Sequence, residues 1–353
     1  MALFEIKGRG TALNPVNRFE LIELEYDNAW LESGELPSHK TVYYEDTTRA
    51  ILSKNDSPDI SFTYSINPYR GCEHGCIYCY ARPTHEYFGW SAGLDFETKI
   101  LVKRDAPKLL AEAFRGRKWE PQIIAFSGNT DCYQPIERKL EITRGCLEVF
   151  LRFRNPLGMI TKNALILRDL DLLQELARRN LVSVAISITT LDNQLCRKME
   201  PRTSAPQKRL ETIAQLAQAG VPVSVNAAPM SPGLNDHELP AILAAAAEHG
   251  AQRAGYILVR LPYANKELFV DWIKTHYPER AEKVLSAIRD VRNGRLNDPR
   301  FGKRFAGEGE RAEALAKLFA ACCQKHGLNQ NYVRLTTEHF RREETRQGDL
   351  FGG

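Results

Sequence analysis

The stretch GCEHGCIYCYARPTHEY, residues 71–87, places three cysteines within eight positions. Three residues separate Cys72 from Cys76, and two residues separate Cys76 from Cys79. Thiolates are the usual ligands of iron–sulfur clusters in proteins, and this spacing suits the spread corners of a cubic cluster. Because four cysteines are the usual complement, three of them leave one iron open. The stretch therefore predicts a cluster with one position free for a further molecule.

Zinc is the other metal that this group of cysteines would suit. Structural zinc sites take four closed ligands and usually combine one Cys-x-x-Cys pair with a second pair further along the chain. No second pair follows here, although His74 or His85 would be available as a fourth ligand. A structural metal module therefore stays open as the alternative to a cluster.

The overall composition is typical of a large protein of the reducing cytoplasm. At 353 residues the chain exceeds the length at which one ordinary core stops growing, so one large domain with appendages is expected. Eight cysteines are too sparse for the disulfide framework of a small secreted protein. No apolar run has the length of a signal-peptide core or a membrane span. We therefore expect a cytoplasmic location and no membrane contact.

Short apolar runs rich in β-branched residues alternate with amphipathic stretches through the middle of the chain. Such runs are typical of buried strands in a parallel sheet. With one strand expected just before the cysteines, the predicted strands are 61–68, 122–128, 157–163, 181–190, 221–229 and 255–262. Within residues 204–220, apolar side chains recur at helical spacing and Gly220 stands where a helix would end. The alternation predicts βα units with right-handed crossovers, in an open sheet or a barrel.

Polar residues follow the predicted strands at their carboxyl ends. After the cysteine loop of the first strand, these are Ser127 to Asp131, Thr161 to Asn163, Ser187, Thr189, Thr190, Asn226 and Arg260. Loops turn polar at the ends of strands in many proteins, so no single residue is assigned a role by this pattern alone. In parallel sheets, however, these ends meet on one rim where the chemistry lies. The sequence predicts thiolates, hydroxyls, amides and a lysine around one mouth.

The motif Cys-x-x-x-Cys-x-x-Cys, with Tyr78 before the last cysteine and a predicted strand before the first, resembles that of radical S-adenosylmethionine (SAM) enzymes. The resemblance implies a partial (β/α)6 barrel over residues 61–262, a [4Fe-4S] cluster, and SAM on the open iron. In that family one electron from the cluster cleaves SAM to methionine and a 5'-deoxyadenosyl radical, which takes a hydrogen atom from the substrate. The resemblance also implies a reductant such as flavodoxin or ferredoxin.

Within that superfamily the chain is similar to the spore photoproduct lyase branch and its uncharacterised bacterial relatives. The similarity rests on INPYRGCEHGCIYCYARPTHEY, SGNTDCYQPIERKLEITR, ITKNALILRDLDLL and MEPRTSAPQKRLETI. It implies that Cys72, Cys76 and Cys79 hold the cluster, and that Tyr78 packs against the adenine. The remaining implied SAM contacts are Lys162 to the carboxylate, Ser187 to the ribose, and Gly128, Asn129, Thr130 and Asp131 along the methionine end. An ammonium for a carboxylate and a hydroxyl for a hydroxyl are chemically apt pairings.

One departure from the lyase pattern concerns the hydrogen atom that is returned to the product. In the lyase a cysteine near the end of the second strand donates it, and the matching position here is Gly128 or Asn129, neither of which has a thiol. Tyr80 resembles a tyrosine of that relay, and nearby Cys132 is either a substitute donor or a packing residue. The resemblance therefore implies Tyr80 and Cys132 as catalytic candidates. It implies radical chemistry, either lyase-like repair or a modification of DNA, and leaves lesion reversal of the lyase type open.

Two features of the C-terminal half point to nucleic acid. Residues 279–304 contain eight basic and four acidic residues, an excess that suits phosphate contacts or a solvated helix face. The net charge of the whole chain, +4, is too small to argue for nucleic acid by itself. Near the end of the chain, QGDLF at Gln347–Phe351 resembles the peptide by which bacterial repair and replication proteins hold the sliding clamp, with Gly348 in place of the usual leucine.

These observations predict an N-terminal extension (1–60), the barrel (61–262), a helical region (263–340) and a flexible tail (341–353). The function expected is a cytoplasmic radical SAM enzyme with nucleic acid as substrate. The alternatives are a radical SAM enzyme that acts on a protein or small metabolite, and a metal-containing module that binds nucleic acid without turnover. Lys162 and Ser187 distinguish the enzyme from the module, because a structural metal site needs neither of them.

Overall fold

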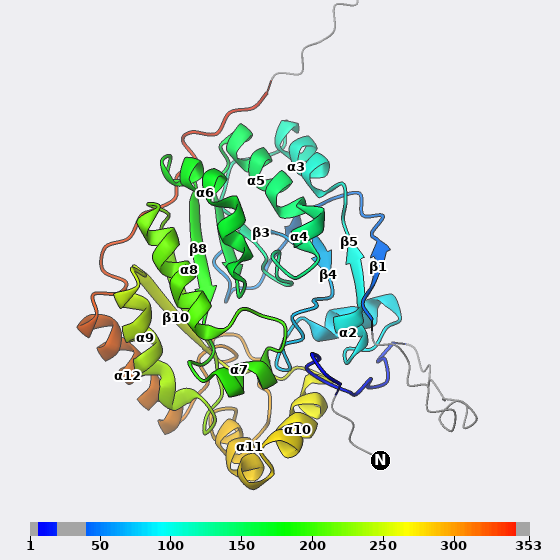
Figure 1. Cartoon of the computed structure of the whole chain (residues 1–353), viewed down its shortest axis with the longest axis vertical. Helices are drawn as coiled ribbons and strands as arrows, with labels where there is room; N and C mark the ends of the chain where they lie inside the picture. Colours follow the sequence, from blue (N-terminus) through cyan, green and yellow to red (C-terminus); the bar gives the residue numbers. More distant parts are fainter. Residues whose placement is uncertain (1–5, 20–39, 344–353) are drawn as a thin grey trace, which may run out of the picture.

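The computed structural model describes residues 6–19 and 40–343 (Figure 1). Across these residues, the main sheet has the strand order β10-β9-β8-β7-β6-β3-β2. Its strands are β2 Ser53–Lys54, β3 Tyr64–Ile66, β6 Ile124–Phe126, β7 Leu157–Thr161, β8 Val182–Ser187, β9 Val223–Met230 and β10 Arg253–Leu258. A smaller sheet, in the order β1-β5-β4, consists of β1 Val42–Glu45, β5 Lys99–Val102 and β4 Tyr69–Arg70.

The helices connect and cover these strands. The α-helices are α2 Asp95–Thr98, α3 Ala106–Arg115, α4 Glu137–Leu140, α5 Ile142–Phe153, α6 Leu170–Ala177, α7 Asn193–Met199, α8 Pro206–Gln218, α9 Leu239–Glu248, α10 Asn265–His276, α11 Ala281–Asp290 and α12 Glu310–Lys325. The short 3-10 helices are η1 Arg82–Phe88, η2 Ala164–Asp169, η3 Asp236–Glu238 and η4 Pro278–Arg280.

All six predicted strands are present, and they form a parallel series. From β3 to β10 each strand pairs in parallel with the next one along the chain in this sheet, while β2 adds antiparallel to β3 at the edge. The end strands β10 and β2 do not pair with each other, so the barrel stays open. Helices α3, α5, α6, α8 and α9 lie on its outer side (Figure 1). The fold is a partial (β/α)6 barrel with a helical C-terminal region.

The apolar runs form strands whose alternate side chains fill the core. In β8 the alternate residues Val182, Val184 and Ile186 are 0–1% exposed and belong to one core cluster. Helix α8 buries its own residues Leu210 and Ile213, as its periodicity predicts. Gly220 adopts φ +75° just beyond the end of the helix. A positive φ is accessible to glycine without steric cost, which is why the helix ends there.

The smaller sheet was not predicted from the sequence. Strand β4 has only two residues, too few for any periodicity to be read. Its position matters because β4 leads directly into Gly71 and the cysteine loop. Through β5, whose Ile100 and Val102 are buried, this sheet attaches the start of the loop to the core.

The region after residue 262 is helical, as predicted, and it shares a core with the cysteine loop. Phe269 and Trp272 of α10 and Leu285 of α11 belong to the same apolar cluster as Ile77 and Tyr78. The peptide Gln347–Phe351, predicted to bind a sliding clamp, lies outside the described residues. Over the described ranges, no helix combines the length and apolar character that crossing a membrane requires.

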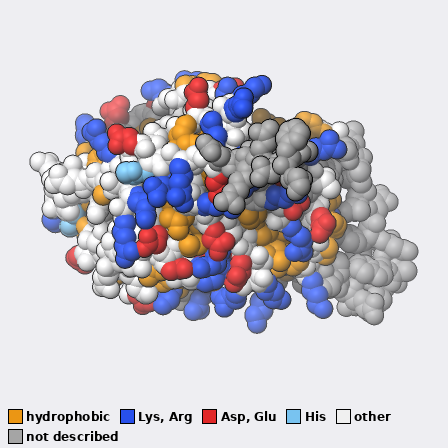
Figure 2. Space-filling view, turned by 90° about the horizontal axis from the view of Figure 1, so that it is seen from above, with side chains coloured by type: hydrophobic (Ala, Val, Ile, Leu, Met, Phe, Trp, Pro, Cys, Tyr) orange, Lys and Arg blue, Asp and Glu red, His pale blue; other side chains and the backbone are white. Residues whose placement is uncertain are grey.

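The basic stretch 279–304 is partly used inside the fold. Arg292 is fully buried and donates to the carbonyls of Leu258, Val259, Lys303 and Arg304. Two further arginines of the stretch form ion pairs, Arg300 with Asp298 and Glu308, and Arg304 with Asp59. On the face shown in Figure 2, Lys and Arg side chains lie among Asp and Glu side chains. The sequence excess therefore overstates the basic surface that the fold presents.

Candidate active site

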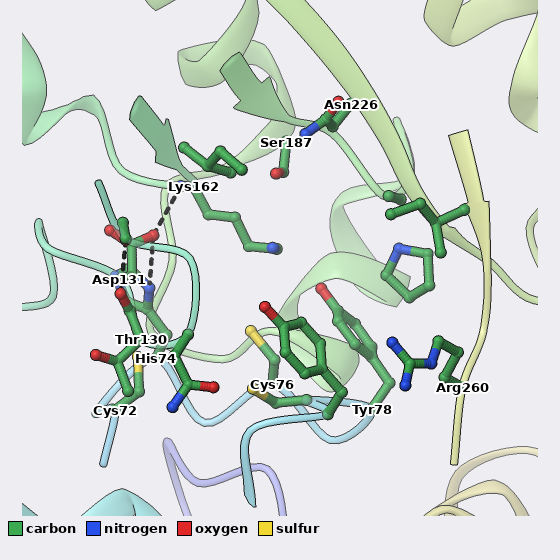
Figure 3. Close-up of a pocket in the computed structure, with 18 of the residues that line it drawn as sticks. Cys72, His74, Cys76, Tyr78, Thr130, Asp131, Lys162, Ser187, Asn226 and Arg260 are labelled. Atoms are coloured by element: carbon green, nitrogen blue, oxygen red, sulfur yellow. Dashed lines mark hydrogen bonds and ion pairs between the residues drawn. The ribbon is translucent and has the colours of Figure 1, made fainter. Parts of the chain in front are cut away.

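A pocket opens at the carboxyl ends of the parallel strands, between them and the cysteine loop (Figure 3). It is lined by Cys72, His74, Cys76, Tyr78, Cys79, Tyr80, Ser127, Asn129, Thr130, Asp131, Ile160, Thr161, Lys162, Ser187, Asn226, Ala228, Pro229, Ile257, Leu258, Arg260 and Phe305. The rim predicted from the ends of the strands is therefore a real cavity. Of the residues predicted to bind the cofactor or to act in catalysis, Gly128 and Cys132 do not line it, and of the other residues predicted at the rim, Asn163, Thr189 and Thr190 do not.

The cysteine loop follows β4 and folds back over the pocket. Gly71 and Gly75 have φ of +78° and +65°, values that glycine adopts readily, and they turn the chain before Cys72 and before Cys76. The Cys72 amide donates to the Phe96 carbonyl at 2.9 Å, which fixes the start of the loop. All three cysteines are free thiols that face the same pocket. In the described part of the chain, no three His, Cys, Asp or Glu side chains converge closely enough to hold a single metal ion.

A buried ion pair supports the loop from its outer side. The Arg82 guanidinium pairs with the Glu97 carboxylate at 2.5 Å, and both side chains are fully buried. Arg82 also donates to the carbonyls of Cys76 (3.0 Å) and Gly75 (3.2 Å). Because a buried charge needs full compensation, this pair and its hydrogen bonds fix the backbone between the cysteines.

Residues 6–19, here called the N-terminal strap, dock against the same loop. The Gly10 amide donates to Glu97 Oε2 at 2.9 Å. The backbones of Gly10 and Gly75 lie so close that a Cβ on Gly10 would be 1.8 Å from the Gly75 carbonyl oxygen. No larger residue fits there without moving the strap or the loop.

We expect Gly10→Val to loosen the cysteine loop. The added side chain overlaps the Gly75 carbonyl, and overpacking of this kind costs about 1–3 kcal/mol. Thermal unfolding of the metal-free protein and the iron retained after air exposure would measure the effect. Ala12→Val, at an exposed position of the same strap, is the matched control. Equal stability and equal iron retention in the two variants would contradict the docking argument.

Lys162 extends from the end of β7 into the centre of the pocket (Figure 3). Its ammonium lies 5.9 Å from the centre of the Tyr78 ring. Burial alone would lower the pKa of Lys162, but negative charge on Cys76 and Glu200 outweighs burial and raises it. The pocket therefore contains a cation beside the cysteines.

Asp131 organises the loops around that cation. Its Oδ1 accepts from Thr161 Oγ1 (2.8 Å) and the Tyr133 amide (2.9 Å), and its Oδ2 accepts from the Lys162 amide (2.9 Å). His74 Nδ1 lies 3.4 Å from Oδ2. Burial alone would lower the pKa of His74, but Asp131, with Cys72, raises it to about 10, so the pair is ionic. Both carboxylate oxygens are thus occupied by the protein itself.

Tyr78 is held by a buried network that the sequence did not predict. Its hydroxyl donates to Glu200 and lies 3.3 Å from Thr189 Oγ1. Glu200 in turn pairs with Arg209, and these two side chains are 0% and 1% exposed. Burial alone would raise the pKa of Glu200, but Arg209 and then Lys162 lower it to about 2. Glu200 is the glutamate of the motif MEPRT, residues 199–203, and the sequence alone assigned no role to it.

Tyr80 and the turn after β6 form the near wall of the pocket. Tyr80 donates its hydroxyl proton to the Gly128 carbonyl, and the residue is 48% exposed. The amides of Asn129 and Thr130 both donate to Asn67 Oδ1, at 2.8 and 3.2 Å. Gly128 thus contributes its carbonyl to Tyr80 and does not itself line the pocket.

The structure places Cys132 in the core and not at the pocket. Its side chain is 0% exposed and belongs to the main apolar cluster, and burial raises the pKa of its thiol well above the ordinary value. Ser127, with φ +72°, closes a tight turn in which its hydroxyl accepts from the Cys132 amide. The turn directs Asp131 toward the pocket and the next side chain away from it. Of the two alternatives for Cys132, packing is the one that this placement favours.

The two histidines considered as metal ligands have other surroundings. His74 lines the pocket with its ring between Asp131 and Asn163. His85 is fully buried outside the pocket, with Nε2 2.8 Å from the Lys99 carbonyl oxygen. The positions of the two rings therefore do not support either histidine as a fourth metal ligand beside the three cysteines.

The open end of the pocket contains Arg260 and Phe305. The Arg260 guanidinium carbon lies 4.9 Å from the Phe305 ring centre and 5.8 Å from that of Tyr80. Its Nε is buried and has no hydrogen-bond partner in the described part of the chain. Phe305 was not predicted; it reaches the pocket because its carbonyl accepts from the Leu258 amide at the end of β10. This end of the pocket therefore combines the Arg260 guanidinium with an aromatic surface.

Comparison with known proteins agrees with this geometry. Residues 66–246 match the Radical SAM superfamily. An uncharacterised protein of Mycobacterium tuberculosis is 34% identical over 250 residues, 70% of this chain and 74% of that protein. A radical SAM Nalpha-GlyT isomerase of Pseudomonas phage M6 is 25% identical over 219 residues, 60% of this chain and 43% of that protein.

Among solved structures, spore photoproduct lyase complexed with dinucleoside spore photoproduct has a similar fold. The TM-score is 0.56 at 18% identity, over 81% of this chain and 80% of that one. Members of the superfamily use SAM and an iron–sulfur cluster, and they need a reductant. The pocket, the three cysteines and the matched residues together lead to one conclusion: the chain belongs to the radical SAM superfamily and is a radical SAM enzyme.

Proposed function

We propose that Cys72, Cys76 and Cys79 hold a [4Fe-4S] cluster, with SAM in the adjoining pocket and nucleic acid as the substrate. The observation that carries the proposal is the donor set: three free thiols and a buried lysine face one cavity. Three thiolates with one open corner suit a cluster that also binds SAM. Eight free cysteines suit the reducing cytoplasm, the location that we propose.

The chain's own residues have distinct tasks in this proposal. Lys162 would pair with the SAM carboxylate. Ser187 lies at the end of β8 and is 3% exposed, and its hydroxyl would form a hydrogen bond with the ribose hydroxyls. Tyr78, held by Glu200, would lie against the adenine. Asp131, whose oxygens are already occupied, would position Lys162 and His74 along the methionine end, together with Asn129 and Thr130. When bound, the cluster supplies the electron that cleaves SAM to methionine and a 5'-deoxyadenosyl radical.

Tyr80 is the catalytic candidate that the geometry supports. It lines the pocket between the cysteines and Arg260, and its hydroxyl proton is held on the Gly128 carbonyl. A phenol at this position could give its O–H hydrogen atom to a substrate radical without help from Cys132. The phenoxyl radical left on Tyr80 would then take one electron from the external reductant and one proton from solvent.

The open end of the pocket supports nucleic acid as the substrate. There Arg260 and Phe305 combine a guanidinium group with an aromatic ring. Bases stack on such rings, while guanidinium groups pair with phosphates. The similar fold of a lyase complexed with dinucleoside spore photoproduct also supports this substrate class. A protein or small-metabolite substrate is the alternative outcome of the test.

The test follows the hydrogen atom. Protein reconstituted without oxygen is reduced with dithionite and supplied with SAM and either fully deuterated DNA or a deuterated protein or metabolite fraction. We expect 5'-deoxyadenosine to contain deuterium when the deuterated DNA is supplied, and to contain none when the protein or metabolite fraction is supplied. Deuterium only from the protein or metabolite fraction would transfer the substrate to the alternative class. Intact SAM under every condition would return the chain to a module without turnover.

Removal of the Lys162 ammonium should weaken SAM binding. A lost hydrogen bond to a charged group costs about 1.5–3 kcal/mol. Lys162→Ala is therefore expected to raise the dissociation constant of SAM by about 10- to 100-fold. Calorimetry would measure it, with Lys139→Ala on the exposed side of α4 as the control. Equal affinity in both variants would refute the assignment of Lys162.

Arg260 gives a prediction that is specific to nucleic acid. Arg260→Gln should weaken binding of a single-stranded oligonucleotide and reduce the dependence of log K on log salt by about one unit, the effect of one lost phosphate contact. Binding of SAM should be unchanged, because Lys162 and Ser187 remain. Fluorescence anisotropy at several salt concentrations would measure it. Arg117→Gln, at an exposed arginine in the segment between α3 and β6, should behave as wild type, and an equal loss there would show a nonspecific charge effect.

A further inference from the structure

A second pocket lies on the outer side of the cysteine loop, where the N-terminal strap meets the start of β1. It is lined by Ile6, Lys7, Gly8, Arg9, Lys40, Thr41, Tyr43, Glu73 and Arg202. None of these residues lines the pocket proposed for SAM. The surface brings together four segments that are distant in the sequence, and we call it the basic pocket.

The basic pocket presents positive charge. Lys7, Lys40 and Arg202 contribute cationic groups, and Lys7 and Lys40 are exposed. Arg9 adds a fourth, anchored on the Glu97 carbonyl (2.8 Å) and on Thr41 Oγ1 (3.0 Å). The one acid among the lining residues, Glu73, is 1% exposed.

Both carboxylate oxygens of Glu73 already have partners within the protein, so Glu73 does not neutralise the outer face of the pocket. Its Oε1 accepts from Thr41 Oγ1 at 3.0 Å and lies 3.2 Å from the Arg202 guanidinium. Its Oε2 accepts from the Ile136 amide at 3.1 Å. The buried carboxylate thus holds the pocket together, while the two lysines face solvent.

The floor of the basic pocket is the cysteine loop itself. Glu73 directly follows Cys72, and the Arg202 amide donates to the carbonyl of His74 at 3.4 Å. The strap is fixed to the same loop where Gly10 abuts Gly75 and donates to Glu97. A molecule bound at the basic pocket is therefore separated from the cysteines by one layer of backbone.

We propose that the basic pocket is the docking surface of the electron donor, a small acidic one-electron carrier of the flavodoxin or ferredoxin type. This proposal rests on the proposed cluster. SAM and substrate would occupy the inner side of the loop, so the outer side is the short route that stays open to a protein donor. One electron leaves the carrier and one enters the cluster, so the carrier is oxidised and the cluster reduced by one electron each.

The charge of the surface selects the partner. Opposite charges on two proteins raise the rate of encounter at low salt, and electron-transfer complexes are small and short-lived. Among the described residues, two exposed lysines, Lys7 and Lys40, lie over one buried acid, and such a surface fits a carrier with acidic groups around its redox centre. The rigid attachment of the strap to the loop keeps this surface at a fixed position relative to the cysteines.

The experiment compares two reductants on the reconstituted full-length protein. Lys7→Glu combined with Lys40→Glu should lower the rate of cluster reduction by photoreduced flavodoxin at least tenfold at low ionic strength, and high salt should reduce that difference. Reduction by dithionite, which is small and needs no docking surface, should be unchanged, as should SAM cleavage with dithionite. The reduction rate is followed by the loss of cluster absorbance.

Lys317→Glu combined with Lys325→Glu is the matched control, because both lysines are exposed on α12, which packs against α9. It should be reduced by flavodoxin at the wild-type rate. Equal rates in wild type and the Lys7/Lys40 variant, or an equal loss in the α12 control, would overturn the docking surface. So would wild-type protein that dithionite reduces and excess flavodoxin hydroquinone does not. A protein that dithionite cannot bring to SAM cleavage would instead defeat the proposed function.

Discussion

Cys76→Ala is expected to yield a colourless protein that cannot cleave SAM. The wild type purified without oxygen should be brown, with about four irons and four sulfides per chain. Cys76 is the middle one of the three proposed ligands, and its thiol faces the pocket beside Lys162. The variant keeps two of the three proposed thiolate ligands, which is too few to hold the proposed cluster.

Iron and sulfide analysis, the visible spectrum and the yield of 5'-deoxyadenosine would measure this loss. Cys146→Ala is the control, because Cys146 is fully buried in α5 and belongs to the main core cluster. It should lower stability and keep the colour. Cys132→Ala should also keep both iron and SAM cleavage if that residue only packs. Stoichiometric zinc without iron in the wild type would reject the cluster.

Arg209→Met is expected to destabilise the fold by about 3–5 kcal/mol, the cost of leaving a buried charge without its partner. Arg209 pairs with Glu200 and donates to the carbonyls of Ser187 (2.9 Å) and Ser204 (2.7 Å). The loss should also reach the pocket, because Glu200 holds Tyr78. Urea unfolding of the metal-free protein would measure the change in free energy.

The loss in Arg209→Met should depend on pH in a defined direction. In the wild type the pKa of Glu200 is lowered from 4.5 to about 2. A folded-state pKa below the unfolded value adds stability that is present above the unfolded pKa and disappears as the pH falls toward the folded one. In the variant the lowering of the Glu200 pKa by Arg209 is lost while burial still disfavours the charged form, so protonation of Glu200 relieves part of the cost of burying its charge.

The difference in unfolding free energy between the two proteins is therefore largest near neutral pH and narrows between about pH 4.5 and 2. Lys208→Met, the adjacent exposed residue on α8, is the control and should stay close to wild type. If the difference in unfolding free energy between wild type and Arg209→Met is the same at pH 3 and pH 7, the charge of Glu200 does not cause the loss of stability.

Local patterns in the sequence were sufficient to predict the cysteine loop, the parallel strands and several residues at their carboxyl ends. The three cysteines are close neighbours along the chain, so their spacing alone predicted one metal-binding loop. The six buried strands have apolar runs because both faces of a parallel sheet are covered, and each run could be read within its own few residues. Lys162, Ser187 and Asn226 were predicted at the rim because a strand's carboxyl end is defined by where its apolar run stops.

Neighbours distant in the sequence were decided only by the tertiary structure. Gly10 lies against Gly75, Glu200 ties Tyr78 to Arg209, and Phe305 returns to the end of β10. Each of these contacts depends on how separate segments pack, and no periodicity or spacing in any one segment contains that information.

The contrast between Asp131 and Cys132 gives the physical reason most directly. The two are adjacent in the chain, yet the turn closed by Ser127 directs one side chain into the pocket and the other into the core. The sequence by itself determined which chemical groups this enzyme has and near which strand each one lies. Which of them face the same cavity was decided by backbone turns and long-range packing, because those fix the direction of a side chain.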